Sequence, residues 1–212
     1  MDAFIDFFFT QYSEYETIDI VLEILGSIFG LLSVYYSMKN NVLVFPTGII
    51  STSIYVYILL KWGLLGDTLI NFYYTIMSIY GWWIWTRKVD SDHVTPITAT
   101  TSREHIYSVL IFFATAIGVF AIYEYFDKWQ SWVSYVDILT TAIFFVGMWL
   151  MAKRKLENWI YWIIGDIITV PLYFHKGLTF SSFQYLIFTI LAIYGYKHWK
   201  NNLNNNLLAA NA

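Results

Sequence analysis

Apolar residues dominate this chain in seven long runs, each separated from the next by a shorter polar segment. The runs cover residues 18–38, 41–60, 64–86, 105–125, 131–151, 157–175 and 178–197. Each has about the 20 residues that an α-helix needs to cross the hydrocarbon core of a bilayer. The pattern therefore predicts an all-α integral membrane protein with seven transmembrane helices.

Three segments do not fit this pattern. Residues 1–17 contain several phenylalanines but are too short and too acidic to span a bilayer, so we expect an N-terminal segment lying at the membrane interface. Residues 87–104 are polar, contain Pro96 and form the one long connection. Residues 200–212 are rich in asparagine, and we expect a disordered tail there.

The chain contains an internal repeat. Residues 22–85 align without a gap on residues 136–199, an offset of 114 residues, and 15 of the 64 pairs are identical. Such self-similarity predicts two related three-helix units, residues 18–86 and 131–199, joined by residues 87–130 with the fourth helix. One crossing helix between units of three gives both units the same orientation, a 3+1+3 parallel repeat of the kind that transporters use around a central site.

Composition and charge narrow the class further. The chain is 58% hydrophobic, 21% aromatic and only 13% charged, which is incompatible with a soluble domain of 212 residues. It contains no cysteine, and its four histidines lack the spacing of metal ligands, so we expect no cofactor. The 12 basic residues are outnumbered by 15 acidic ones, and we expect no nucleic-acid partner.

The distribution of Lys and Arg predicts the topology. Nine of them fall at the ends after the first, third, fifth and seventh spans: Lys39, Arg87, Lys88, Arg103, Lys153, Arg154, Lys155, Lys197 and Lys200. The other side holds Lys61, Lys128 and Lys176. Because basic residues remain in the cytoplasm, the N-terminus is expected outside and the C-terminus inside.

The candidate chemistry lies in the sixth span. Trp159, Trp162 and Asp166 follow one another at helical spacing, and Tyr173 lies two turns further on the same face. A carboxylate within an apolar span is costly and usually functional, and indole faces bind flat cations. We therefore predict a site for a small, flat, cationic solute. For Trp159 alone, a position in the interfacial aromatic belt is an equally good interpretation.

Polar residues of other spans complete the predicted site. Asn71, Tyr74 and Ser78 share a face of the third span, and Gln184 and Phe188 share a face of the seventh. Amides bind ribose or carboxamide groups without the desolvation cost of a charge. Each taken singly is as readily explained by contact between helices. Glu23 and Asp137, which the repeat relates, are better interpreted as structural or gate-forming residues.

These residues resemble a known family. The pattern W-x-x-W-x-x-x-D formed by Trp159, Trp162 and Asp166 follows Arg154, Glu157 and Asn158, and IYG occurs at 79–81 and again at 193–195. Together they resemble the PnuC-type vitamin transporters. The resemblance implies a SWEET-like fold, a homotrimer in the bacterial inner membrane, and Asn158 as a further binding residue. It also implies facilitated diffusion of nicotinamide riboside, a vitamin B3 precursor for NAD biosynthesis, trapped by a cytoplasmic kinase.

Other functions remain to be distinguished. Thiamine is also a cationic aromatic that the same fold could carry, whereas riboflavin is neutral and larger and fits less well. A channel is the best alternative to a carrier. A retinal protein would need a lysine deep in the last span, and an enzyme would need a nucleophile and base, a metal set or paired carboxylates in the bundle. The sequence contains none of these, so we expect no enzyme.

Overall fold

The described part of the chain is helical, as the sequence predicts. The computed structural model describes residues 16–61, 65–87, 95–127, 129, 131–175 and 179–210. Its helices are α2 (Thr17–Met38), α3 (Val44–Lys61), α4 (Leu65–Thr86), α5 (Ser102–Tyr125), α6 (Ser131–Ala152), α7 (Asn158–His175) and α8 (Thr179–Ala210). Every helix begins within a few residues of the first residue of a predicted span. Residues 1–15 of the predicted interfacial segment lie outside the described residues.

Four helices of the described part are long and apolar enough to cross a membrane, namely α2, α3, α5 and α6. The helices α4, α7 and α8 are also at least 18 residues long, and they carry Asp67, Asp166 and Gln184 respectively. These three side chains line an internal cavity. Each of the three helices therefore presents a polar side chain to the inside of the bundle.

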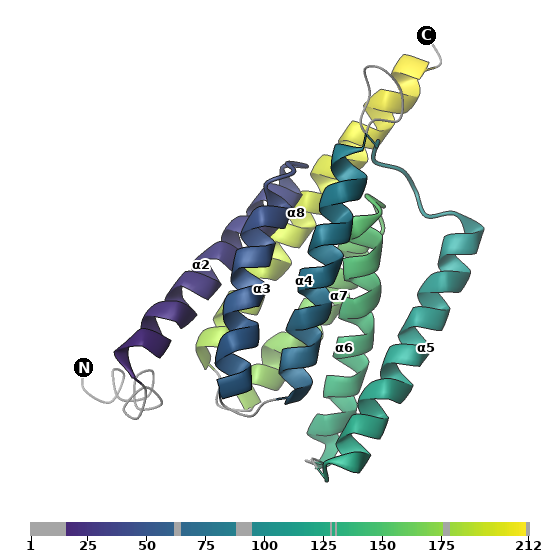
Figure 1. The fold of residues 1–212 in the computed structure, drawn as a ribbon. Coiled ribbons are helices and arrows are strands. Elements are labelled where there is room, and N and C mark those ends of the chain that lie inside the picture. The colour runs from purple at the N-terminus through teal and green to yellow at the C-terminus, as the bar shows by residue number, and fades with distance from the viewer. Residues whose placement is uncertain are drawn as a thin grey trace.

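The helices pack in two groups of three. In one group α3 lies between α2 and α4, and in the other α7 packs against both α6 and α8. The groups meet where α2 contacts α8 and where α4 contacts α6. These two contacts occupy corresponding positions in the sequence repeat. Helix α5 packs against α6 at one edge of the bundle (Figure 1).

Two tryptophans join the groups at the end of the bundle that carries the α2–α3 and α6–α7 loops. Trp85 Nε1, on α4, donates a hydrogen bond to the carbonyl of Met151 on α6 at 3.2 Å. Trp199 Nε1, on α8, donates to the carbonyl of Ser37 on α2 at 2.9 Å. Donors and acceptors are both related by the offset of 114 residues. Each carbonyl also accepts a backbone N–H from Asn40 or Arg154 at 2.9 Å, so each indole is a further donor at a helix end of the other group.

Asn40 and Arg154, again 114 residues apart, form another connection at this end. Both have a left-handed backbone, with φ of 54° and 59°. Nε and Nη2 of Arg154 donate to Asn40 Oδ1 at 3.0 and 2.8 Å, and the guanidinium lies 4.6 Å from the centre of the Trp85 ring. Burial lowers the pKa of Arg154 to about 10. The side chain stays charged at neutral pH and ties the two loops together.

The end of the polar connection is held against the α6–α7 loop. Thr98 forms an isolated parallel bridge with Lys155, in which Leu156 N donates to Thr98 O at 3.0 Å. Glu104, near the start of α5, forms an ion pair with Lys155 at 2.8 Å. Residues 95–101 are therefore held against the bundle by backbone hydrogen bonds and an ion pair. The polar composition of residues 87–104 does not predict these contacts.

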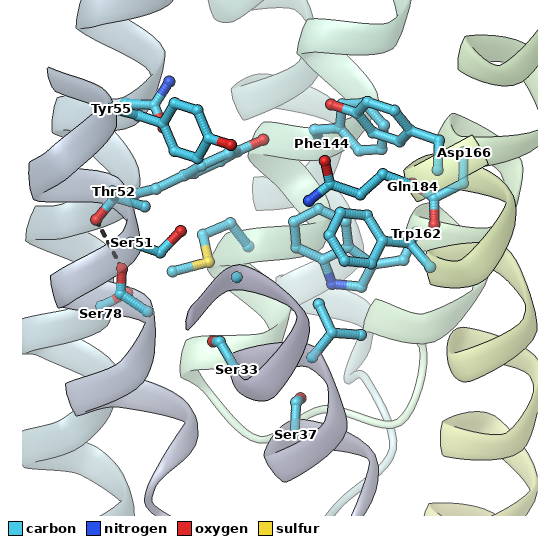
Figure 2. Close-up of a pocket in the computed structure, with 18 of the residues that line it drawn as sticks. Ser33, Ser37, Ser51, Thr52, Tyr55, Ser78, Phe144, Trp162, Asp166 and Gln184 are labelled. Atoms are coloured by element: carbon cyan, nitrogen blue, oxygen red, sulfur yellow. Dashed lines mark hydrogen bonds between the residues drawn. The ribbon is translucent and has the colours of Figure 1, made fainter. Parts of the chain in front are cut away.

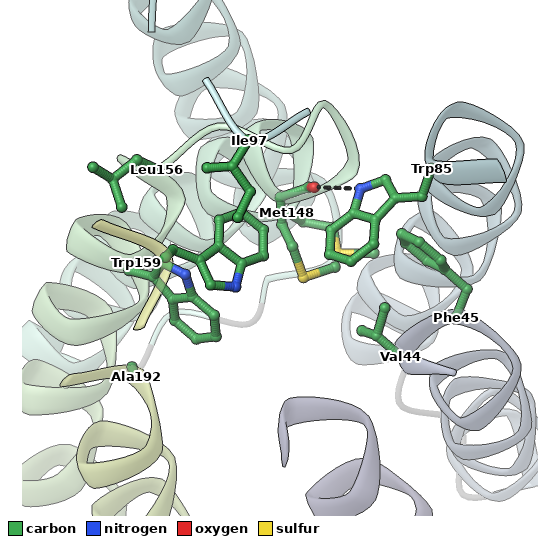
Figure 3. Packing of buried hydrophobic residues seen from close by; sticks show 10 residues of the cluster. Val44, Phe45, Trp85, Ile97, Met148, Leu156, Trp159 and Ala192 are labelled. Atoms are coloured by element: carbon green, nitrogen blue, oxygen red, sulfur yellow. Dashed lines mark hydrogen bonds between the residues drawn. The ribbon is translucent and has the colours of Figure 1, made fainter. Parts of the chain in front are cut away.

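A cluster of buried apolar residues lies at the same end of the bundle (Figure 3). We call it the tryptophan cluster, and its members are Val44, Phe45, Trp85, Ile97, Met148, Met151, Leu156, Trp159, Ala192 and Trp199. Phe45 packs edge-on against Trp85 with ring centres 5.0 Å apart. Trp159 packs edge-on against Trp199 at 5.6 Å. The repeat therefore places equivalent aromatic pairs side by side in one core.

The tryptophan cluster requires glycine at position 195. A Cβ atom added there would lie 2.6 Å from ring carbons of Trp159, whose side chain is fully enclosed. Gly195→Ala is expected to destabilise the protein by about 1–3 kcal/mol through overpacking, measured as a lower thermal midpoint in detergent. Gly118→Ala is the control, because nothing lies within 4 Å of its added Cβ. Equal midpoints for native protein and Gly195→Ala would contradict this packing.

The C-terminal end differs from the prediction. Helix α8 continues to Ala210, whereas the sequence predicts disorder from residue 200. Leu203 packs against the tryptophan cluster, and no proline or glycine follows Gly195 to end the helix. Asparagine content alone therefore gave the wrong prediction for residues 200–210, since the tertiary contact and the preceding helix favour continuation.

Candidate functional site

A cavity of about 460 Å³ lies between the two groups of helices (Figure 2). The side chains that line it come from α2, α3 and α4 on one side and from α6, α7 and α8 on the other. Val44, Met148, Met151, Trp159 and Ala192 belong both to the cavity wall and to the tryptophan cluster. The cluster therefore forms the floor of the cavity, at the end that carries the α2–α3 and α6–α7 loops.

Eight of the nine predicted site residues line this cavity. They are Asn71, Tyr74, Trp159, Trp162, Asp166, Tyr173, Gln184 and Phe188. Asn158 does not belong to the lining. It is fully buried at the start of α7, and its Nδ2 donates to the carbonyl of Lys155 at 2.5 Å. Its contacts are those of a residue that closes the first turn of the helix.

Asp166 lies in the middle of α7 and faces the cavity (Figure 2). Its exposed fraction is only 2%, and no hydrogen bond or ion pair joins it to another residue of the described part. An unpartnered buried carboxyl group is costly in a bundle of apolar helices. The helix therefore presents to the cavity a polar group that no other described residue binds.

The ring of Trp162 belongs to an aromatic wall beside this carboxyl group. Phe144 and Trp162 are stacked, with ring centres 5.5 Å apart and an interplanar angle of 29°. Phe144 also stacks on Tyr185 at 6.0 Å and 22°, and Tyr185 meets Phe188 edge-on at 5.8 Å. A flat solute could extend this stack at roughly the spacing that aromatic rings prefer.

Trp159 has a different position from Trp162. Its ring is 2% exposed and packs within the tryptophan cluster, which excludes the aromatic-belt interpretation. Its Nε1 is buried and has no hydrogen-bond partner among the described residues. The same holds for Oγ of Ser37, which also lines the cavity. The floor therefore carries two unpaired polar atoms beside its apolar surface.

The sequence prediction missed most of the wall built by the first group of helices. Ser33, Ser37, Ser51 and Thr52 line the cavity there, together with Ser78, which the sequence does place on the face of Asn71 and Tyr74. Serine and threonine are common contacts between membrane helices, so their types alone do not identify a site. The internal repeat could have identified part of this wall, because Thr52 and Gly48 correspond to Asp166 and Trp162 at the offset of 114 residues.

Charge in the cavity is of one sign. Glu23, Asp67 and Asp166 line it, and none of its described lining residues is Lys, Arg or His. Glu23, which the sequence favours as a structural or gate-forming residue, therefore lies in the cavity wall. Three carboxyl groups between low-dielectric walls favour a positively charged occupant and oppose a negatively charged one.

Comparison with known proteins identifies the family. Residues 20–201 match the sequence profile described as "Nicotinamide mononucleotide transporter". The chain is 23% identical to the nicotinamide riboside transporter PnuC of Escherichia coli (strain K12), over 85% of both chains. It is 25% identical to the riboflavin/roseoflavin transporter RibM of Streptomyces davaonensis, over 84% of this chain and 83% of RibM.

The fold also has a solved counterpart. The crystal structure of the vitamin B3 transporter PnuC superposes with a TM-score of 0.66 at 23% identity, covering 89% of this chain and 84% of that one. The profile spans most of the helical bundle, from α2 to the part of α8 that contains Trp199. The chain therefore belongs to the nicotinamide mononucleotide transporter family and is a multi-pass membrane transporter, not an enzyme.

Proposed function

We propose that this protein carries nicotinamide riboside across a bacterial inner membrane by facilitated diffusion, with the cavity as its solute site. Three of the relatives, from E. coli, Shigella flexneri and Neisseria mucosa, are nicotinamide riboside transporters. The single observation that carries the proposal is the unpartnered carboxyl group of Asp166 beside the stacked rings of Phe144 and Trp162. A pyridinium ring is flat and cationic and matches both features.

The charge of the cavity favours the riboside over the mononucleotide that the family description names. Nicotinamide mononucleotide carries a phosphate group, and the lining offers carboxyl groups but, among the described residues, no basic side chain to bind it. A phosphate recognition site normally contains Arg or Lys. The riboside carries only the positive ring and neutral hydroxyl groups. Phosphorylation by a cytoplasmic kinase would then trap the solute and make uptake effectively one-way.

The binding residues proposed are those that the cavity brings together. Asp166 would neutralise the ring cation, and Trp162 would stack on it. Asn71, Tyr74, Tyr173, Gln184 and Phe188 complete the lining around them. Trp159 would contact the solute from the floor. Asn158 is proposed in a supporting role, because it fixes the start of α7 just before Trp159.

The proposed mechanism uses two repeats in a 3+1+3 parallel arrangement. The reciprocal bonds of Trp85 and Trp199 and the matching backbone of Asn40 and Arg154 support a two-fold relation between the groups. Such a relation allows one group to rock against the other around a central site. The loops with Lys39, Lys153 and Lys155 then lie in the cytoplasm, with the N-terminus outside. Assembly into a homotrimer, each protomer with its own pathway, completes the proposal.

Riboflavin is the second candidate, because RibM is as similar to this chain as the PnuC relatives are. Its isoalloxazine ring is flat and its ribityl chain carries hydroxyl groups. Riboflavin is neutral, however, and leaves the buried carboxyl group of Asp166 without a counter-charge. Thiamine, a cationic aromatic, satisfies the charge, but none of the relatives named above is a thiamine transporter.

Uptake by purified protein in liposomes tests the proposal. Labelled nicotinamide riboside is expected to enter with saturation and to exchange faster when unlabelled riboside is trapped inside, because only a carrier shows accelerated counterflow. Nicotinamide mononucleotide, thiamine and riboflavin are the competing solutes. Uptake that is linear in concentration would indicate a channel, and saturable uptake of riboflavin alone would replace the proposed solute.

A further inference from the structure

The two groups of helices give the cavity two chemically different walls. Five of its six described Ser and Thr lining residues belong to α2, α3 and α4, whereas six of its eight aromatic lining residues belong to α6, α7 and α8. Figure 2 shows Ser33, Ser51 and Thr52 on the side of the first group, opposite Phe144 and Trp162. The aromatic wall explains recognition of a flat ring. We call the opposite wall, with Ser33, Ser37, Ser51, Thr52 and Ser78, the hydroxyl wall. Binding of a flat ring by the aromatic side chains does not account for these hydroxyl groups.

The difference arises at two contact sites that the repeat shares. In the first group the contacts pair glycine with serine: a Cβ atom added to Gly48 would lie 3.0 Å from Oγ of Ser33, and one added to Gly30 would lie 3.1 Å from Oγ of Ser51. Both glycines line the cavity. Each serine therefore lies against the backbone of the neighbouring helix, where it has little freedom to turn.

In the second group the same contacts pair glycine with an aromatic ring. Gly147 and Gly165 occupy the positions of Ser33 and Ser51, and Trp162 and Phe144 occupy those of Gly48 and Gly30. A Cβ atom added to Gly165 would lie 2.3 Å from the ring of Phe144. At each of the two contacts the second repeat therefore has an aromatic ring and the first repeat has a hydroxyl group. The two walls of the cavity differ at corresponding positions for this reason.

Hydrogen bonds fix what the two serines can offer a solute. Ser33 Oγ donates its proton to the carbonyl of Val44, and Ser51 Oγ donates to the carbonyl of Gly26, both at 2.8 Å. A hydroxyl group has one proton and two acceptor sites. With the proton committed to a backbone carbonyl, each oxygen remains an acceptor toward the cavity. The wall therefore suits a solute that donates hydrogen bonds through hydroxyl groups.

We infer that Ser33 and Ser51 bind sugar hydroxyl groups of the transported solute and thereby select a ribosylated aromatic ring over the same ring without its sugar. The inference rests on the proposed function, because it takes the cavity to be the solute site. It assigns the ring to the wall built by α6 to α8 and the sugar to the wall built by α2 and α3. Selectivity for the sugar is then a property of the first repeat.

The test uses two cations that share a ring and differ in the sugar. Nicotinamide riboside and 1-methylnicotinamide are titrated calorimetrically into native protein and into the Ser33→Ala/Ser51→Ala variant. Loss of two hydrogen bonds, at about 1 kcal/mol each, is expected to raise the Kd of the riboside roughly 30-fold. The Kd of 1-methylnicotinamide is expected to change by less than about twofold, because it donates nothing to this wall. Retained binding of that cation also reports a folded cavity.

Ser182→Ala is the matched control. Its hydroxyl group donates to the carbonyl of Val170 at 2.8 Å, like Ser33 and Ser51, but it does not line the cavity. Both ligands should bind this variant as they bind native protein. Equal weakening of both cations in the Ser33→Ala/Ser51→Ala variant, or weakening of neither, would overturn the inference and leave the proposed function intact. Failure of native protein to bind the riboside would overturn the proposed function, and this inference with it.

Discussion

Asp166→Ala is expected to weaken nicotinamide riboside binding by about 100-fold or more while leaving a folded protein. The carboxyl group is buried, faces the cavity and has no partner in the described part of the chain, so the positive ring of the solute would be its counter-charge. Asp166→Asn keeps hydrogen-bonding atoms but loses the charge, and about a tenfold loss of affinity is expected. Titration calorimetry on detergent-purified protein measures both.

Stability supplies an independent check on the Asp166 variants. Removal of an unpartnered buried carboxyl group deletes a desolvation cost and no hydrogen bond within the protein. The thermal midpoint of ligand-free Asp166→Ala should therefore equal or exceed that of native protein. In the binding measurement Asp137→Asn is the control, because this carboxylate lies on α6 and does not line the cavity. Unchanged riboside affinity in Asp166→Ala would remove the proposed site.

The helices, and the cavity wall that α7 contributes, could be predicted because both depend on the spacing of residues that are close in sequence. Runs of apolar residues locate the spans to within a few residues. Trp162 and Asp166 are four residues apart, so an α-helix places them on one face whatever surrounds it. The end of α8 could not be predicted in this way, because its continuation depends on the contact of Leu203 with a distant core.

Ser33 and Ser51 of the hydroxyl wall escaped prediction for a different reason. A serine in a membrane helix has the same sequence signature whether it joins helices or lines a cavity. Ser33 and Ser51 do both, since each bonds a neighbouring helix and faces the cavity. Their role emerges only when the two groups are compared at equivalent positions, where glycine and an aromatic ring replace serine and glycine. The repeat was predicted, but which member of each pair faces a solute requires the packed structure.

Loosening the floor of the cavity is expected to open it toward the end with the α2–α3 and α6–α7 loops. Trp85 and Trp199 each donate a hydrogen bond to the other group, and both belong to the tryptophan cluster that closes this end. Trp85→Phe/Trp199→Phe removes both bonds and keeps most of the apolar ring. At about 1 kcal/mol for each bond, the open form should become roughly 30-fold more populated relative to the closed form.

Modification of a cysteine at position 37 measures this opening. The chain contains no cysteine, so Ser37→Cys introduces a single thiol in the cavity wall, where the native hydroxyl group has no described partner. A membrane-impermeant thiol reagent applied from the side of the basic loops should react at least about tenfold faster in the double Trp→Phe background. Trp83→Phe is the control, because Trp83 is 56% exposed on the same helix and lies outside the cluster. Equal reaction rates in both backgrounds would mean that the two indole bonds do not hold this end closed, and the floor would then depend on apolar packing alone.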